Sequence, residues 1–139
     1  MPGAPVPQDG GLSAIDKAVG LARARIRPRV DALALARETA EGALVVDIRP
    51  EELHRRDGPL EGAVVIDRNV LEWRLDPTSA HRLPEMDNPG RRVIIVCDEG
   101  YASSLAAASL ADVGLTNVTD LAGGFQAWLA TKAPEHGAG

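Results

Sequence analysis

The stretch "VIIVCDEGYASSLAAASL" (residues 93–110) decides the predicted fold, because it has the pattern of a buried strand, a tight loop and a helix in succession. Four β-branched residues precede Cys97, the only cysteine, and such a continuous apolar run is typical of a strand buried on both faces. Gly100 allows the chain to reverse, and Ser103 is expected to cap the helix that follows. The stretch therefore predicts one strand–loop–helix unit of a parallel sheet.

Three other apolar runs predict further strands, over residues 43–48, 62–67 and 117–121. The segments between the runs have helical patterns, and one of them starts with Asp31 as a cap and ends at Gly42. The other expected helices cover residues 50–58, 68–77, 103–114 and 123–132. Because strands alternate with short helices, the sequence predicts an α/β domain with a parallel sheet and helices on both faces.

The size and charge of the chain argue against several classes of protein. Its 139 residues suffice for one domain with its own core, and the net charge of −5 argues against nucleic-acid binding. The most basic segment, "RARIRPR" (23–29), is interpreted as a solvated helix end and connector. No apolar run approaches the ~18 residues that a membrane span needs. We therefore expect neither nucleic acid nor a membrane as a partner.

The termini and the cysteine count indicate a cytoplasmic protein. A single cysteine cannot form an internal disulfide, and residues 1–11 lack the charged and apolar regions of a signal peptide. Richness in Pro and Gly predicts disordered tails over residues 1–11 and 132–139. Between them we expect a helical extension over residues 12–29 and the main domain over residues 30–131.

The loop after Cys97 has the features of a site that stabilises a sulfur anion. In an open parallel sheet, ligands bind at the carboxyl ends of the strands, and Cys97 ends the run 92–97. A short loop that leads into a helix can direct successive backbone N–H groups toward its centre. The sulfur of Cys97 would occupy that centre, which favours a thiolate or a persulfide over a neutral thiol. Cys97 is therefore the candidate nucleophile rather than an inert core residue.

At this point the sequence resembles a single-domain rhodanese, a member of the rhodanese-like sulfurtransferase family. The resemblance spans about residues 30 to 130 and rests on four motifs in order: "VVDIRPEEL" (45–53), "GPLEGAVVI" (58–66), "VIIVCDEGYASS" (93–104) and "LAGGFQAW" (121–128). It implies a five-stranded parallel sheet flanked by helices. It also implies a ping-pong reaction in which Cys97 takes sulfane sulfur from a donor and passes it, as a persulfide, to a thiol or cyanide acceptor.

The resemblance also implies the remaining site residues and needs no cofactor. The substrate-binding cradle would be the backbone of the loop, which comprises Asp98, Glu99, Gly100, Tyr101, Ala102 and Ser103. Many rhodaneses have an arginine in this loop that holds an anionic donor, and the aligned residue here is Ala102. Pro59 likewise stands where the family often has a histidine.

The two carboxylates beside the thiol are unusual for a site that accepts anions. A carboxylate about 7 Å from a thiolate raises its energy by roughly 0.6–1.2 kcal/mol at an effective dielectric of about 40–80. Asp98 and Glu99 should therefore oppose a dianionic donor, the more so because Ala102 carries no charge. We expect weak activity with thiosulfate and a different donor, either a small persulfide or a protein with a basic face. The alternative is that both carboxylates point to solvent, where screening makes their effect on the donor nearly irrelevant.

Two arginines at other strand ends could supply the positive charge that the loop lacks. Arg68 is a candidate substrate-binding residue, with a pair to Asp67 or Glu72 as the alternative. Arg49 is expected to be structural and to pair with Asp47 or Glu52. Trp73 is expected in the core, with one wall of a substrate pocket as the alternative. The three histidines lack the spacing of metal ligands, so no metal site is proposed.

Two other functions remain open alongside sulfur transfer. A non-catalytic rhodanese-like module could bind a protein or sense oxidants through Cys97. A cysteine-dependent phosphatase or arsenate reductase would use a similar loop, but it requires an arginine six residues after the cysteine. Ser103 occupies that position, which disfavours phosphatase chemistry.

Overall fold

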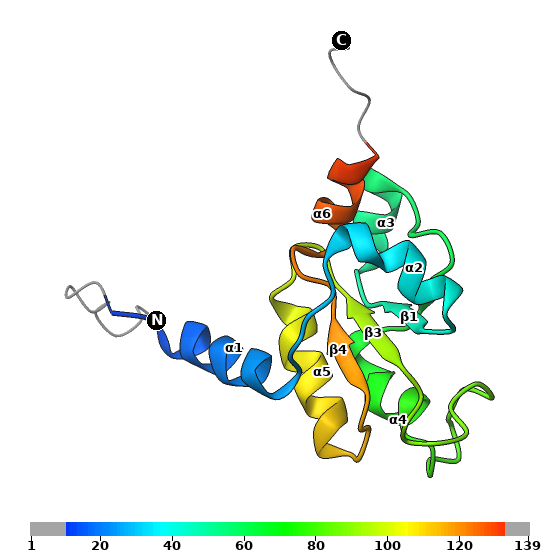
Figure 1. Ribbon diagram of the computed structural model, residues 1–139. Coiled ribbons are helices and arrows are strands. Elements are labelled where there is room, and N and C mark those ends of the chain that lie inside the picture. Colours follow the sequence, from blue (N-terminus) through cyan, green and yellow to red (C-terminus); the bar gives the residue numbers. More distant parts are fainter. Residues whose placement is uncertain (1–10, 133–139) are drawn as a thin grey trace.

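The computed structural model describes residues 11–132 and shows an α/β domain built on a parallel sheet (Figure 1). The strands β1 (Leu44–Asp47), β2 (Val64–Val65), β3 (Val93–Val96) and β4 (Val118–Asp120) lie in the order β2-β1-β3-β4. All three pairings are parallel, with Val46 opposite Ile95 in the centre of the sheet. The α/β class and the parallel sheet predicted from the sequence are confirmed.

Six α-helices and two 3₁₀ turns connect the strands within residues 11–132. The helices are α1 (Ala14–Arg25), α2 (Leu35–Ala40), α3 (Glu51–Asp57), α4 (Leu71–Leu75), α5 (Ala102–Asp112) and α6 (Gly124–Thr131). The 3₁₀ turns precede α2 and α4, over Ala32–Ala34 and Arg68–Val70. The tails expected to be disordered fall mainly on residues 1–10 and 133–139, which lie outside the described residues.

The central strands are buried on both faces, as their continuous apolar sequences predict. On one face Val46, Val93 and Ile95 pack into a cluster with α4 and α5, which contribute Leu71 and Leu110. On the other face the cluster comprises Val30, Leu35, Val45, Leu60, Ile94, Val96, Leu121 and Phe125. Helices α2 and α6 therefore cover the second face.

The fifth strand implied by the rhodanese resemblance is reduced here to a single bridge. Val30 pairs in parallel with Leu121 next to β4, donating to the Asp120 carbonyl at 3.0 Å and accepting from the Ala122 N–H at 2.8 Å. Pro28 has no N–H to extend the ladder, and the Asp31 side chain caps the next turn by accepting from Leu33 N–H. The described sheet therefore has four strands and one bridge rather than five strands.

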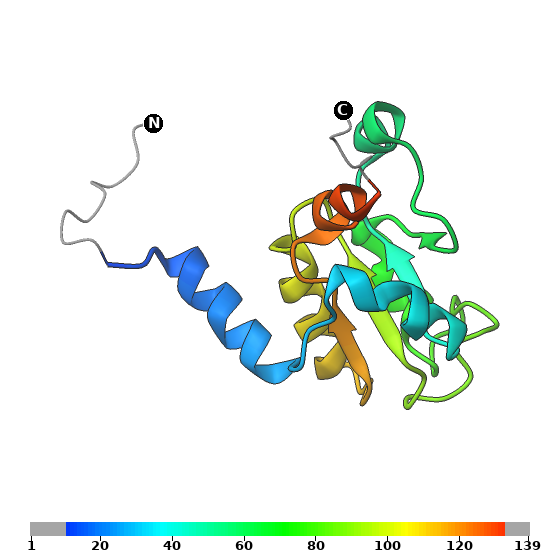
Figure 2. The ribbon, with the colours of Figure 1, turned by 45° about the horizontal axis from the view of Figure 1, so that its top comes forward.

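Helix α1 projects from the body of the domain with its C-terminal end against α5 (Figures 1 and 2). Ser13 and Asp16 form a capping box at its start, which fixes the N-terminus of the helix. Val19 and Ala22 are buried, whereas Leu12, Ile15 and Leu21 are exposed. The connector that follows α1 runs beside β4 and brings Arg29 to the carboxyl end of the sheet.

Candidate active site around Cys97

Cys97 follows β3 directly and accepts two backbone hydrogen bonds from its own loop. The N–H groups of Gly100 and Ser103 donate to its Sγ at 3.1 and 3.2 Å. Ser103 lies in the first turn of α5, so the positive end of that helix faces the sulfur. The side chain is nearly buried, with 7% of the residue exposed. This arrangement is suited to stabilise negative charge on sulfur.

Helix α6 holds the first two carbonyl groups of the loop away from the sulfur. The N–H groups of Phe125 and Gln126, in its first turn, donate to the Cys97 and Asp98 carbonyls at 2.8 and 3.0 Å. Gly124 makes this approach possible, because a Cβ there would lie 2.6 Å from the Cys97 carbonyl oxygen. The "GGF" sequence (123–125) therefore supports the Cys97 loop through close backbone contacts.

A buried carboxylate fixes the helical side of the loop. Asp120, at the end of β4, is fully buried and accepts from the hydroxyls of Ser103 and Ser104 at 2.7 and 2.8 Å. Arg29 Nε donates to its other oxygen at 2.7 Å. Ser103 was predicted to cap α5, and this is wrong, because Tyr101 is the N-cap residue and makes no side-chain cap. The Ser103 hydroxyl instead connects the loop to β4.

The two acidic residues of the loop differ in their surroundings. Gln126 Nε2 donates to Asp98 Oδ1 at 3.0 Å, and Arg56 Nη2 lies 3.6 Å from the same oxygen. Arg56 also bonds Asp57 and, with Gln126, lowers the pKa of the Asp57 carboxyl. The charge of Asp98 is therefore partly compensated. Glu99 is exposed, and we find no ion pair for it among the described residues.

A cavity of about 310 Å³ opens over the sulfur. Its lining comprises Ile48, Arg49, Pro50, Arg68, Cys97, Asp98, Glu99, Tyr101 and Ala102. Most of the predicted substrate-binding set, including Arg68, thus lies around one cavity. Gly100 and Ser103 do not line this cavity, and their backbone N–H groups donate to the sulfur instead.

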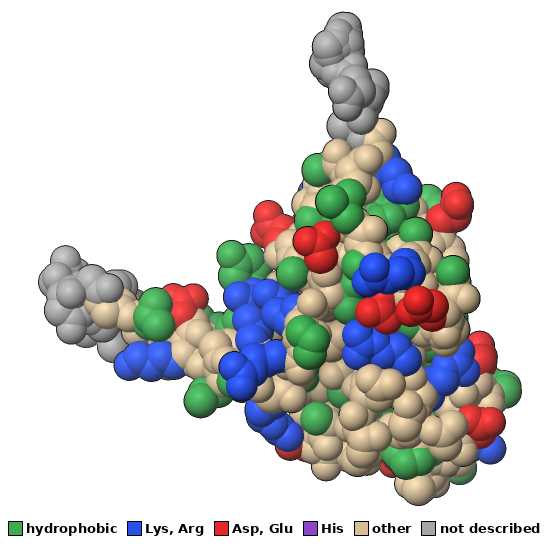
Figure 3. Space-filling view, in the orientation of Figure 1, with side chains coloured by type: hydrophobic (Ala, Val, Ile, Leu, Met, Phe, Trp, Pro, Cys, Tyr) green, Lys and Arg blue, Asp and Glu red, His purple; other side chains and the backbone are tan. Residues whose placement is uncertain are grey.

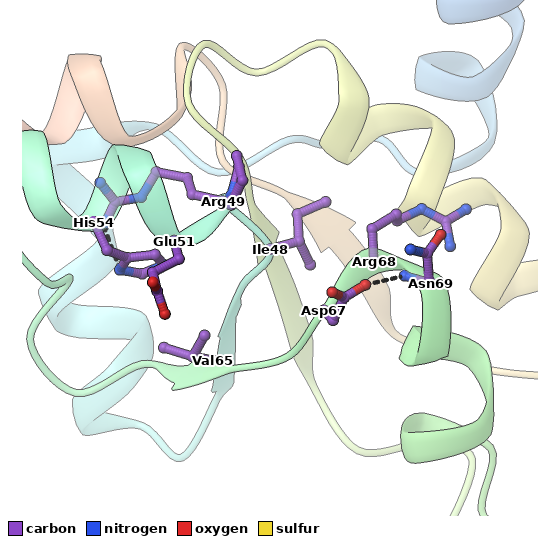
Figure 4. A pocket seen from close by; sticks show the side chains of 9 residues that line it. Ile48, Arg49, Glu51, His54, Val65, Asp67, Arg68 and Asn69 are labelled. Atoms are coloured by element: carbon purple, nitrogen blue, oxygen red, sulfur yellow. Dashed lines mark hydrogen bonds between the residues drawn. The ribbon is translucent and has the colours of Figure 1, made fainter.

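A second cavity of about 610 Å³ adjoins the first and shares Ile48, Arg49, Pro50 and Arg68 with it (Figure 4). In Figure 4, Arg49 and His54 lie on one side, Arg68 lies on the other, and Ile48 is between them. The remaining lining includes Glu51 and Asp67. The second cavity therefore has both acidic and basic side chains in its lining.

The two candidate arginines have different roles in this geometry. Arg49 is fully buried, pairs with Asp47 at 2.9 Å and lies 3.6 Å over the centre of the Phe125 ring. The prediction that Arg49 pairs with Asp47 is confirmed. Arg68 bonds Glu72 at 3.0 Å, and its side chain is 40% exposed at the Cys97 cavity. Arg68 therefore forms the predicted pair and also presents a cation to the cavity.

Sequence reasoning missed several residues that shape the site: Arg23, Arg29, Asp120, Gly124 and Gln126. The segment 23–29 was interpreted as solvated, and this is wrong for Arg23 and Arg29, which bond the Cys97 loop. An aspartate inside a buried strand was the available signal for Asp120, because a buried charge requires partners. Trp73 is 57% exposed and not a core residue.

Neither a metal-ligand cluster nor a membrane-spanning helix is found in the part of the chain that the structure describes. Within residues 11–132 no group of three or more His, Cys, Asp or Glu side chains is placed to hold a metal ion. None of the helices in that range is both long and apolar enough to cross a bilayer.

Two relatives found by comparison with known proteins are named thiosulfate sulfurtransferase. The thiosulfate sulfurtransferase GlpE of Pseudomonas entomophila strain L48 is 36% identical over 111 residues, which are 80% of this chain and 89% of that protein. Its namesake from Pseudomonas fluorescens strain SBW25 is 34% identical over 100 residues, 71% of this chain and 82% of that protein.

Two solved structures share the fold over most of their length. A Rhodopseudomonas palustris CGA009 protein of unknown function, named a "possible tyrosine phosphatase", matches with a TM-score of 0.76 and 30% identity over 95% of this chain and 98% of its own. Human single-domain sulfurtransferase matches with a TM-score of 0.64 and 24% identity over 76% and 98%. The model of the rhodanese-like domain matches residues 31–131. The chain therefore belongs to the rhodanese-like domain family.

Proposed function

We propose that this protein is a sulfurtransferase that carries sulfane sulfur on Cys97 as a persulfide. The observation that carries the proposal is the pair of N–H donors on Sγ, together with loop carbonyls that bond outward to other donors. Such a centre stabilises a terminal sulfur that bears negative charge. The relatives named thiosulfate sulfurtransferase support the same chemistry.

The reaction has two steps that balance without a cofactor. In the first, the Cys97 thiolate attacks the outer sulfur of thiosulfate, a sulfur–sulfur bond forms, the bond to the sulfonate breaks, and sulfite leaves with the electron pair. In the second, cyanide attacks the terminal sulfur of the persulfide, thiocyanate forms, and the Cys97 thiolate returns. With glutathione persulfide as donor, glutathione is the leaving group and takes the proton.

The donor is the finer part of the proposal. Ala102 and the exposed Glu99 make the entrance to the sulfur unfavourable for a dianion, although Asp98 is partly compensated by Gln126 and Arg56. Arg68 is the substrate-binding cation that faces the cavity. We therefore propose that thiosulfate is a weak donor and that a persulfide, small or carried by a protein with a basic face, is the better one. A cytoplasmic location stays a prediction from the sequence.

The same departure from the family favours one second candidate function. Without a loop arginine, the domain would serve as a protein-binding or oxidant-sensing module through Cys97. Phosphatase chemistry has less support, because Ser103 stands where that mechanism needs arginine and its hydroxyl is bonded to Asp120.

Intact-mass analysis after brief incubation with thiosulfate, or separately with glutathione persulfide, tests the proposal. Cys97 is the only cysteine, so every thiol adduct reports on this site. We expect a gain of one sulfur, faster from the persulfide, that is absent in Cys97→Ser and discharged by cyanide. If neither donor adds sulfur, sulfurtransfer is refuted and the binding or sensing module is favoured.

A further inference from the structure

Two arginines from outside the matched domain bond the turn of the Cys97 loop. Arg23 Nη2, near the end of α1, and Arg29 Nη2, in the connector, donate to the Gly100 carbonyl at 2.8 and 2.9 Å. Figure 3 shows arginine and lysine side chains gathered where α1 meets the body. The match to the family model begins at residue 31, so both arginines lie before the matched range.

The Gly100 carbonyl also accepts from the Ser104 hydroxyl at 3.3 Å, so the two arginines supply the two shorter of its three side-chain hydrogen bonds. Gly100 has φ +90° and no Cβ, so the peptide unit that follows it can rotate with little steric resistance. A rotated unit would direct the carbonyl oxygen toward the centre that the Sγ occupies. An oxygen dipole there would oppose negative charge on sulfur, whereas the N–H groups of Gly100 and Ser103 favour it.

The surroundings of the two arginines also differ in charge. Arg29 is paired with the buried Asp120 carboxylate, so this pair adds little net charge behind the loop. Arg23 bonds Ser104 Oγ at 3.1 Å and lies 5.1 Å from the centre of the Tyr101 ring. Among residues 11–132 we find no carboxylate paired with Arg23. Arg23 is therefore a cation beside the loop whose charge no carboxylate of residues 11–132 offsets by direct pairing.

We propose that Arg23 and Arg29 are positioning residues for sulfur transfer, which hold the Gly100 carbonyl away from the sulfur and so keep the loop competent for an anionic thiolate and persulfide. Helix α1 and its connector (residues 14–29, the α1 segment) then contribute to sulfur transfer at Cys97. This inference rests on the sulfurtransferase function proposed above. The R. palustris match leaves about seven of the 139 residues outside it, fewer than the 12 residues of α1, so it includes part of that helix.

The chain offers a matched control on the same helix. Arg25 pairs with Asp112, and both side chains are exposed, at 47% and 64%. It bonds no residue of the Cys97 loop in the structure. Arg25→Met therefore removes the same side chain from α1 without touching the site. Arg23→Met is the test variant, and Arg23→Lys keeps the charge and a donor.

The first readout is the rate at which iodoacetamide alkylates Cys97 at pH 7.5, followed by intact mass. We expect Arg23→Met to slow alkylation about tenfold, Arg23→Lys to recover at least half of the lost rate on a logarithmic scale, and Arg25→Met to match wild type. A loop that had merely loosened would expose the nearly buried thiol and speed alkylation. A rate for Arg23→Met that equals or exceeds that of wild type would overturn the proposal.

The second readout is steady-state sulfur transfer from glutathione persulfide to cyanide. We expect kcat of Arg23→Met to fall about tenfold while KM stays within twofold, because the arginine acts on the sulfur and does not bind the donor. Arg29→Met should show the same kcat loss together with a lower unfolding temperature, since it also strands Asp120. Transfer by wild type with unchanged kcat in Arg23→Met would refute this inference alone. If wild type takes up no sulfur, the proposed function fails, and the alkylation rates still decide the role of Arg23.

Discussion

Replacing Ala102 by arginine should raise the activity of the protein with thiosulfate. Ala102 is exposed and lines the cavity over Cys97, so a longer side chain can extend into that cavity without displacing the core. The two N–H groups that bond Sγ belong to Gly100 and Ser103, so the cradle does not depend on the side chain at position 102. The substitution therefore changes the charge at the entrance and leaves the centre of the loop intact.

The expected gain follows from the charge of the donor. A guanidinium about 5 Å from a dianion gains about 2 kcal/mol at an effective dielectric of about 60. Ordering of the arginine side chain and screening by salt remove about half of this. The remaining ~1 kcal/mol corresponds to about fivefold in kcat/KM for thiosulfate. Glutathione persulfide, which carries no sulfonate beside the transferred sulfur, should gain much less.

The assay is thiocyanate formation with thiosulfate and cyanide at about 20 mM and about 500 mM salt. Ala102→Met serves as the control, since it adds bulk without charge. We expect the advantage of Ala102→Arg over Ala102→Met to shrink at high salt, where the Debye length is only a few ångström. The electrostatic account of the loop is refuted if arginine performs no better than methionine or if the gain is independent of salt.

Three further substitutions test the packing around the loop. Gly100→Ala places a Cβ 2.7 Å from Gly123 N at φ +90°, so persulfide formation should fall at least about 100-fold in a mass assay, and a wild-type rate would show that the turn is dispensable. Phe125→Ala should lower the free energy of unfolding in urea by about 3–5 kcal/mol, because the ring is fully buried under Arg49; a loss below about 1 kcal/mol would contradict this. Burial alone would raise the pKa of Glu72, but hydrogen bonds from Ser109 and Arg68 hold it below its usual value, so the stability lost in Glu72→Gln should be full above about pH 5 and fade as the pH falls through the lowered pKa. An unfolding difference from wild type that grows toward acid pH would have the wrong sign.

The strands could be predicted from local sequence because their burial depends on a pattern that the chain itself displays. Continuous β-branched runs predicted β1 and β3 to within a residue at each end. The run 62–67 yields only Val64–Val65 as β2, because this edge strand pairs on one side and its neighbours turn away. The fifth strand came from the family resemblance, and Pro28 and Asp31 limit it to one bridge.

The candidate site could be predicted only in part, since its supports come from distant segments. Cys97 and the loop lie together in the sequence, and the strand end identified them. The partner of the Ser103 hydroxyl is Asp120, 17 residues later, and the Gly100 carbonyl bonds Arg23, 77 residues earlier. Local patterns contain no record of such pairs. They indicate only that a buried aspartate must have partners somewhere.

Orienting the carbonyls of the Cys97 loop and attracting an anionic donor are separate tasks in this protein, because different segments perform them. Helix α6 directs the carbonyls of Cys97 and Asp98, and the α1 segment directs that of Gly100, so no side chain at position 102 is needed to orient the loop. Position 102 then bears on the charge of the incoming donor alone. It follows that changes at Ala102 should alter the choice of donor with little effect on transfer to cyanide, whereas changes at Arg23 should slow both half-reactions together.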